Sequence, residues 1–182
     1  MRVFISIELP EQIRKEISKE FEKLENSGFV AGNFVNKNNI HLTLKFLGNI
    51  SEEQVEKIKK KLSDISFPKF EVKIGDIGFF PSEQYVRIIW VGLLADELKK
   101  LKEIIDKNLL EIGINSDGRE FSSHITVARI KKINNKDNFL KKIKELKLKK
   151  MSFTVEKVAL MKSELTRDGP NYKTLGELNL KE

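Results

Sequence analysis

The sequence predicts an α+β fold of two similar lobes, in which two antiparallel sheets face a central cleft and the helices lie outside. Three observations support this prediction. Strand-like and helix-like hydrophobic patterns follow one another along all 182 residues. Two of the predicted strands carry the same four-residue pattern, and a predicted helix follows each of them. No segment rich in Gly, Ser or Pro divides the chain, so we expect residues 1–182 to form a single bilobal domain.

The elements of the first half follow from alternation and helical spacing. Apolar residues that alternate with other residues predict strands, and apolar residues spaced three and four apart predict amphipathic helices. Pro10 ends the first strand and Gly48 the second, while Ser51 and Gln54 form a capping box that starts a helix. The predicted elements are a strand over residues 2–8, a helix over 10–26, a strand over 39–47 and a helix over 51–62.

The second half continues the same alternation of element types. A turn at residues 81–83 joins two strands, and Gly113 closes the helix that comes after them. The sequence Asp168-Gly169-Pro170-Asn171 predicts a turn between the last two strands. The predicted elements are strands over residues 70–77 and 85–92, a helix over 95–111, a strand over 121–130, a helix over 136–146, and strands over 152–163 and 172–180.

The two histidines of the chain occupy the same pattern, His41-Leu42-Thr43-Leu44 and His124-Ile125-Thr126-Val127. Because five of the 182 residues are threonine, a threonine two places after both histidines has a chance of roughly 1 in 1000. Side chains alternate between the faces of a strand, so each histidine shares a face with its threonine while the apolar residues face the core. If the two strands border one cleft, two imidazoles and two hydroxyls converge there.

This residue set suits acid and base chemistry. An imidazole has an ordinary pKa of about 6.5, so one neutral and one protonated histidine can act together near neutral pH. Metal sites usually add carboxylates or cysteines, and both four-residue segments lack them. We therefore expect no metal ligands and no cofactor.

The composition narrows the partners and the compartment. A formal net charge of +7 favours an anionic partner such as a nucleic acid or another phosphate compound, although the lysine-rich run at 141–150 is read as a solvated helix face. The chain has no cysteine, its first ten residues do not form a signal peptide, and no apolar run could cross a bilayer. We expect a soluble, cytoplasmic, monomeric protein that does not bind membranes.

Several segments, spread over almost the whole chain, resemble the two-histidine phosphoesterase superfamily. Within it they are most similar to the RNA 2′,3′-cyclic phosphodiesterases, also called the 2′-5′ RNA ligase family. One departure is Ser123, which stands where the family often has proline before the second histidine. The similar segments are residues 2–10, 41–48, 80–83, 87–92, 121–129 and 161–165, with Gly169, Pro170 and Tyr172.

The resemblance implies the bilobal fold of that superfamily and an activity. The activity is metal-independent hydrolysis of the 2′,3′-cyclic phosphate end of RNA, tRNA fragments included, or of nucleotides, to a 2′-phosphate. The resemblance implies His41 as proton donor, His124 as proton acceptor, and Thr43, Thr126 and Arg129 as substrate-binding residues. It also implies a minor ligation activity that joins RNA ends through a 2′-5′ linkage. One alternative stays open, namely that the chain is a non-catalytic relative that binds RNA or a nucleotide in the same pocket.

Some residues near the motifs have two interpretations. Lys45 continues the face of His41 and could reach the phosphate rim, or it could be an exposed lysine at the strand end. Strict alternation puts Arg129 opposite His124, unless a bulge or the strand end turns it into the cleft. The aromatic residues that could stack the terminal base are Phe46, Phe79, Phe80, Trp90 and Phe121. We expect Phe46 and Trp90 in the core and favour Phe80, in a loop beside Pro81, for stacking.

Overall fold

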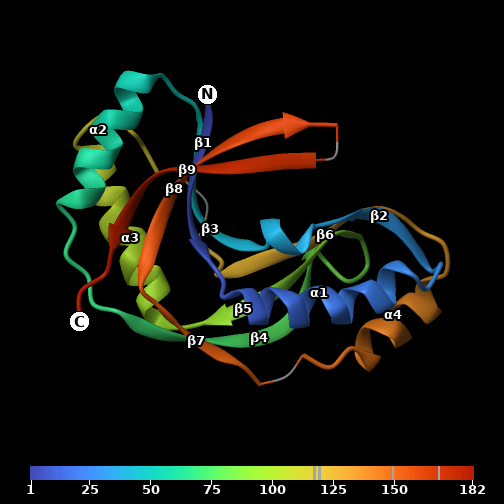
Figure 1. Cartoon of the computed structure of the whole chain (residues 1–182). Coiled ribbons are helices and arrows are strands. Elements are labelled where there is room, and N and C mark those ends of the chain that lie inside the picture. The colour runs from blue at the N-terminus through green and yellow to red at the C-terminus, as the bar shows by residue number, and fades with distance from the viewer. Residues whose placement is uncertain (117, 119, 149, 168) are drawn as a thin grey trace.

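The computed structural model describes residues 1–182 except Asp117, Arg119, Lys149 and Asp168, so Lys149 of the lysine-rich run and Asp168 of the predicted turn lie outside the described residues. The described residues form nine strands, four α-helices and one short 3-10 helix, η1 (Figure 1). The elements are β1 Arg2–Glu8, α1 Glu11–Glu25, β2 Val30–Phe34, η1 Lys37–Asn39, β3 His41–Asn49, α2 Glu52–Ser63, β4 Phe70–Pro81, β5 Val86–Leu94, α3 Asp96–Leu110, β6 His124–Ile133, α4 Lys136–Glu145, β7 Ser152–Val155, β8 Lys157–Thr166 and β9 Gly169–Asn179.

The α+β class and the four helices agree with the prediction, and so does the capping box of Ser51 and Gln54 that starts α2. The single strand predicted over residues 152–163 is wrong, because the chain there forms two strands with different partners. β7 pairs with β4, whereas β8 pairs with β1. The prediction also lacks β2 and η1, which connect α1 to β3.

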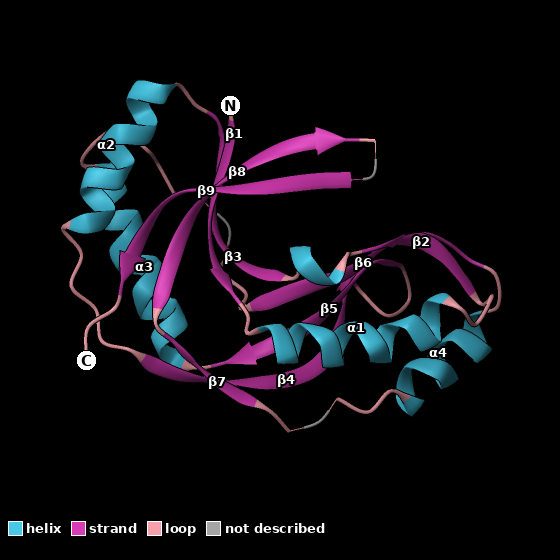
Figure 2. Cartoon of the chain, viewed as in Figure 1, coloured by secondary structure: helices cyan, strands magenta, loops and turns pink. Residues whose placement is uncertain are grey.

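The strands form one curled antiparallel sheet in two halves (Figures 1 and 2). Its order is β7-β4-β5-β6-β3-β1-β8-β9, with β2 paired to β6 off this path. The halves meet where β3 and β6 share a single bridge, between Leu42 and Ile125. The chain crosses this junction repeatedly, since β1 and β3 lie in one half and β2 in the other. The two four-residue motifs therefore lie on the two strands that form the junction.

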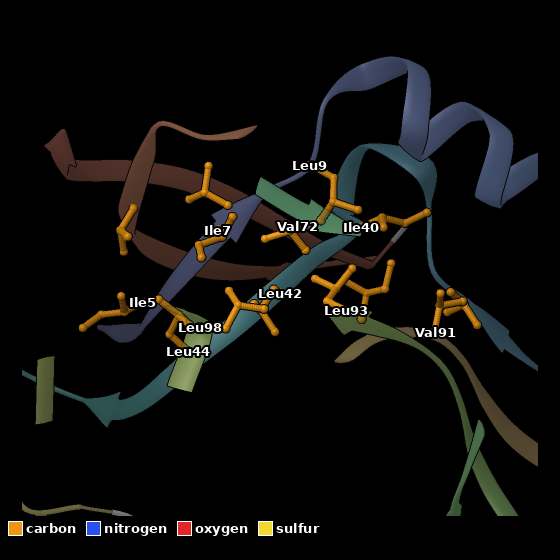
Figure 3. Close-up of a cluster of buried hydrophobic side chains, with 14 of the residues drawn as sticks. Ile5, Ile7, Leu9, Ile40, Leu42, Leu44, Val72, Val91, Leu93 and Leu98 are labelled. Atoms are coloured by element: carbon orange, nitrogen blue, oxygen red, sulfur yellow. The ribbon is translucent and has the colours of Figure 1, made fainter. Parts of the chain in front are cut away.

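The helices pack on the sheet in two pairs, α1 beside α4 and α2 beside α3 (Figure 2). One apolar core serves both halves of the sheet. Figure 3 shows Leu42 and Leu44 of β3 together with Val91 and Leu93 of β5 in this core. Among the described residues, no helix is both long and apolar enough to span a bilayer.

Lys45 differs from both of its interpretations, since its side chain is buried and ion-paired. Opposite β1, Ser6 pairs with Thr43 and Ile5 pairs with Lys45, so Leu44 is an extra residue and the alternation shifts by one. The Lys45 side chain consequently turns toward α3, where its Nζ donates to Asp106 Oδ1 at 2.7 Å and to the Asn115 carbonyl oxygen at 2.9 Å. This bulge decides which side chains of β3 face the same way as His41.

Removing the counterion of Lys45 is expected to destabilise the fold. Asp106→Ala leaves a buried ammonium group without its carboxylate partner, which costs about 3–5 kcal/mol of unfolding free energy when a buried pair is broken. Urea unfolding monitored by circular dichroism measures the change. Glu53→Ala removes one partner of an exposed ion pair, with Lys57, and serves as the matched control with little expected change. Equal urea midpoints for the two variants would contradict a structural role for the buried pair.

Candidate active site

His41, the first residue of β3, has both ring nitrogens engaged. Its Nδ1 lies 2.7 Å from the Asn39 carbonyl oxygen, and its Nε2 lies 3.0 Å from Thr43 Oγ1. Because a carbonyl oxygen only accepts hydrogen bonds, we assign the ring proton to Nδ1. Nε2 then accepts from the Thr43 hydroxyl when the ring is neutral, and it becomes a donor when the ring is protonated.

His124, the first residue of β6, has the same kind of contact at its Nδ1. Its Nδ1 lies 2.8 Å from the carbonyl oxygen of Ser122, again two residues before the histidine. The same argument assigns a proton to Nδ1 and leaves Nε2 for chemistry. The repeated sequence pattern is thus matched by a repeated tautomer-setting contact.

The register between β3 and β6 brings the four motif side chains together. Leu42 and Ile125 are direct partners in an antiparallel bridge and both point into the core. The residues on either side of a bridge point to the opposite face of the sheet. His41 therefore lies across from Thr126, and Thr43 across from His124, on one face of the junction.

Arg129 also lies on this face, because β6 has a bulge. Trp90 of β5 pairs with Thr126 and Ile89 pairs with Ala128, so Val127 is an extra residue. The interpretation with a bulge is therefore the correct one, because the bulge turns Arg129 to the face of His124. A neighbouring glycine makes room for this strand, since a Cβ atom at Gly32 of β2 would lie 2.4 Å from the Arg129 carbonyl oxygen.

Phe46 has the same position on β3 that Arg129 has on β6, because Leu44 is the extra residue in β3. Its side chain is 61% exposed, so the expectation that it lies in the core is wrong. Its ring centroid is 6.3 Å from that of Phe4, which is in turn 5.0 Å from that of His41. Phe46 is thus an exposed aromatic residue on the same face as His41.

Aromatic rings border both histidines. Tyr172 of β9 meets the His41 ring edge-on at 5.3 Å, and Phe80 meets the His124 ring edge-on at 5.0 Å. Trp90 lies 6.0 Å from His124 on the same face, so it is not the core residue we expect. The loop position expected for Phe80 is also wrong, because β4 continues through it to Pro81.

Sequence reasoning gave no role to Phe4 or Tyr172. Phe4 packs on Ala159 and Met161 in a small apolar cluster, separate from the main core, against which Tyr172 rests. The alternation of β1 is the signal that could have revealed Phe4, because it puts Phe4 opposite the core residue Ile5.

The electrostatic surroundings of the two histidines differ in sign. Burial lowers the pKa of His41, while the hydrogen bond to the Asn39 carbonyl and the negative charge of Glu8 raise it. Burial also lowers the pKa of His124, and the positive charge of Arg129 lowers it further, against the hydrogen bond to the Ser122 carbonyl. A carboxylate therefore favours the protonated form of His41, and a guanidinium favours the neutral form of His124.

Arg129 acts on both halves of the sheet. Burial raises the pKa of the Tyr172 hydroxyl, and the charges of Arg129 and then Arg2 oppose that rise. The same guanidinium lowers the pKa of His124. Tyr172 contacts His41, so the charge of Arg129 acts on His124 and on a direct neighbour of His41.

The buried His41 should make the fold sensitive to acid. Because its pKa in the folded protein lies below the ordinary value of about 6.5, the unfolded chain binds more protons as pH falls through that value. The free energy of unfolding should therefore decrease as pH drops below about 6.5. His41→Gln removes this group, and we expect the variant to lose less stability than the wild type between pH 7.5 and 5. Urea unfolding at both pH values checks this, and equal losses would contradict it.

The arrangement can exchange protons and hold an anion. Two imidazoles, two threonines and one arginine face the same side of the sheet at the junction. The described residues offer no group of three or more His, Asp or Glu side chains that could hold a metal ion. The chemistry available to these side chains is therefore proton transfer and hydrogen bonding to a phosphate group.

The chain is similar to a known family over most of its length. A family model described as LigT like Phosphoesterase matches residues 7–90 and 92–172. A Methanocaldococcus jannaschii protein named RNA 2′,3′-cyclic phosphodiesterase is 35% identical over 178 residues, which cover 97% of this chain and 99% of the relative. A Thermotoga maritima protein of the same name is 33% identical over 180 residues, which cover 97% of this chain and 94% of the relative.

Solved structures show the same fold. The crystal structure of TT0787 from Thermus thermophilus superposes with a TM-score of 0.80 at 26% identity, and covers 98% of this chain and 97% of that one. The crystal structure of Escherichia coli LigT complexed with 3′-AMP superposes with a TM-score of 0.79 at 24% identity, and covers 100% of this chain and 98% of that one.

Proposed function

Because the chain belongs to the LigT-like family of two-histidine phosphoesterases, we propose that it hydrolyses the 2′,3′-cyclic phosphate ends of RNA to 2′-phosphates. The observation that carries the proposal is the junction of β3 and β6, where one bridge directs His41, Thr43, His124 and Thr126 to one face. The relatives named RNA 2′,3′-cyclic phosphodiesterase match nearly the whole chain. The net charge of +7 suits an RNA substrate, tRNA fragments among them.

The reaction needs one base and one acid on opposite sides of the phosphorus atom. The water oxygen forms a bond to phosphorus while the bond from phosphorus to the ribose 3′ oxygen breaks. His124 Nε2 takes a proton from the water, and His41 Nε2 gives a proton to the departing 3′ oxygen. The product carries a 2′-phosphate and a 3′-hydroxyl. With a 5′-hydroxyl as the nucleophile in place of water, the same steps form a 2′-5′ linkage and leave a 3′-hydroxyl, which we propose as a minor activity.

The charges beside the two histidines support this assignment of roles. Burial lowers the pKa of His41, and the charge of Glu8, its cross-strand partner, opposes that effect and favours the protonated ring that an acid needs. Arg129 favours the neutral ring that a base needs. A bound phosphodiester adds a negative charge between the rings, which further favours a protonated acid.

The remaining donors hold the phosphate oxygens that do not react. Thr43, Thr126 and Arg129 share the face of the histidines, and their hydroxyl and guanidinium groups can donate to these oxygens. This set balances the charge of the substrate with side chains alone, so we propose a metal-independent reaction. We further propose that residues 1–182 act as one bilobal domain and as a monomer.

Turnover of 2′,3′-cyclic AMP and of an RNA with a cyclic phosphate end, each with and without EDTA, tests the proposal. Release of a 2′-phosphate that EDTA leaves unchanged is the expected result. A 3′-phosphate product would reject the assignment of the leaving oxygen, and loss of activity in EDTA would reject the metal-independent reaction. Binding of the RNA without any turnover would support the non-catalytic alternative instead.

A further inference from the structure

Three polar or charged side chains are buried among the described residues, those of Ser6, Lys45 and Lys102. Both lysines form ion pairs with Asp106. Ser6 is 1% exposed, and its Oγ has no hydrogen-bond partner among the described residues. Because burial of a hydroxyl without a hydrogen bond is destabilising, the serine needs an explanation that the resting contacts of the fold do not supply.

Ser6 lies beside the first histidine motif. Ile5 and Ile7 of β1 point into the core, so the alternation turns Ser6 to the face of the sheet that carries Thr43. Ser6 is the direct antiparallel partner of Thr43 on β3 and of Ala159 on β8. The Cβ atoms of direct partners lie about 4.5–5.5 Å apart, and serine and threonine at such positions can form a hydrogen bond. Alanine offers no polar group, so Thr43 is the cross-strand neighbour that the Ser6 hydroxyl can bind.

We propose that Ser6 is a positioning residue that gives the Thr43 hydroxyl a second hydrogen-bond partner. This inference rests on the proposed function, because it concerns the same site. In the structure Thr43 Oγ1 lies 3.0 Å from His41 Nε2, to which it donates when the ring is neutral. In the proposed reaction the ring is protonated at Nε2, and Thr43 turns its own proton to a phosphate oxygen. A hydroxyl rotates to donate or to accept, so Ser6 then donates to the Thr43 oxygen.

The contact between the two hydroxyls strengthens the hold on the phosphate. In a chain of hydrogen bonds each bond polarises the next, so a donation from Ser6 makes Thr43 a better donor to the phosphate oxygen. The same pair also favours the protonated ring before substrate binds. Once Nε2 of His41 donates to Thr43 Oγ1, the Thr43 proton needs a new acceptor, and Ser6 Oγ supplies it.

The second motif has a different neighbour in the same place. Trp90 of β5 is the direct partner of Thr126, and its indole ring lies over Gly78 of β4, on the side away from Thr126. An indole nitrogen only donates, so Trp90 cannot accept a proton from a threonine as a hydroxyl can. The two-way hydroxyl partner therefore accompanies the motif of His41, the histidine that must carry a proton in the proposed reaction.

Removal of the Ser6 hydroxyl should lower activity without weakening the fold. For Ser6→Ala we expect kcat/KM on 2′,3′-cyclic AMP to fall about 3–10-fold, the fold-change that corresponds to one hydrogen bond. Urea unfolding should show no loss of stability, because alanine buries no unpaired hydroxyl. Ser152→Ala, at the exposed start of the edge strand β7, removes another serine hydroxyl as the matched control and should change neither measurement.

A double-mutant cycle shows whether Ser6 acts through Thr43. Thr43→Val keeps the shape of the side chain and removes its hydroxyl, so Ser6→Ala should cause no further loss of kcat/KM in that background. Three results would overturn the proposal. They are an equal factor of loss in both backgrounds, an unchanged kcat/KM for Ser6→Ala, and a Ser6→Ala protein whose lower activity comes with a lower unfolding free energy.

Failure of the proposed function is recognised separately, by a wild-type protein that does not turn over 2′,3′-cyclic AMP. An NMR titration of the His41 ring then tests the positioning on its own. Ser6→Ala should lower the pKa of His41 relative to the wild type, because the protonated ring leaves the Thr43 proton without its acceptor. Glu8 and Tyr172, the titratable residues that face His41, are the same in both proteins. An unchanged pKa of His41 in Ser6→Ala overturns the proposal.

Discussion

Replacement of His124 by alanine should lower turnover of 2′,3′-cyclic AMP by about 10²–10⁴-fold, and replacement of His41 should do the same, because each removes one proton-transfer group. In the proposed reaction Nε2 of each ring transfers the proton, since Nδ1 is held by the carbonyl of Asn39 or of Ser122. Steady-state rates at saturating substrate measure the loss. Urea unfolding of each variant near neutral pH is the control that separates lost chemistry from lost folding.

The pH dependence of kcat/KM assigns the roles of the two histidines. A base must be deprotonated and an acid protonated, so the wild type should show a bell-shaped profile. His124→Ala should lose the limb that rises with pH, and His41→Ala should lose the limb that falls at higher pH. Loss of the opposite limb in each variant would reverse the acid and base, and full activity in either variant would reject the two-histidine reaction.

The faces of the two motifs could be predicted from sequence because they depend on local alternation. Leu42 and Ile125 point into the core as the two-residue period requires. The same reasoning failed three or four residues further along each strand, where Lys45, Phe46 and Arg129 follow a bulge. A bulge depends on the register with the neighbouring strand and on distant partners. The ion pair of Lys45 with Asp106 joins residues 61 positions apart, beyond the reach of a local pattern.

Other missed features have the same kind of cause. β2 has five residues, two of which are the poor strand formers Gly32 and Asn33, so its sequence alone does not indicate a strand. Its pairing with β6 stabilises it, and Gly32 lets it approach the backbone of Arg129 closely. The meeting of the two halves at one bridge is likewise a tertiary property, although the repeated motif indicated that its two strands share a site.

Replacement of Arg129 by glutamine should lower kcat/KM on 2′,3′-cyclic AMP by about 10²-fold, a typical cost of removing one preorganised donor to the developing charge. Arg129 lies on the same face of the sheet as His124 only because Val127 is an extra residue in β6. In the proposed reaction its charge attracts the phosphodiester and offsets the charge that builds up on the phosphate oxygens. Arg129→Lys should recover part of the loss, because an ammonium group keeps the charge but lacks the planar donor fork.

A second measurement separates a contact with substrate from a general effect of charge. Arg129 lowers the pKa of His124, so Arg129→Gln should raise that pKa and move the rising limb of the pH profile to higher pH. Lys100→Gln removes an exposed charge on α3 and should change neither kcat/KM nor the limb. If Arg129→Gln behaves like Lys100→Gln, the bulge of β6 serves the fold alone. If activity falls while the limb stays in place, Arg129 holds the phosphate without tuning the base, and the preference for His124 as proton acceptor loses its electrostatic support.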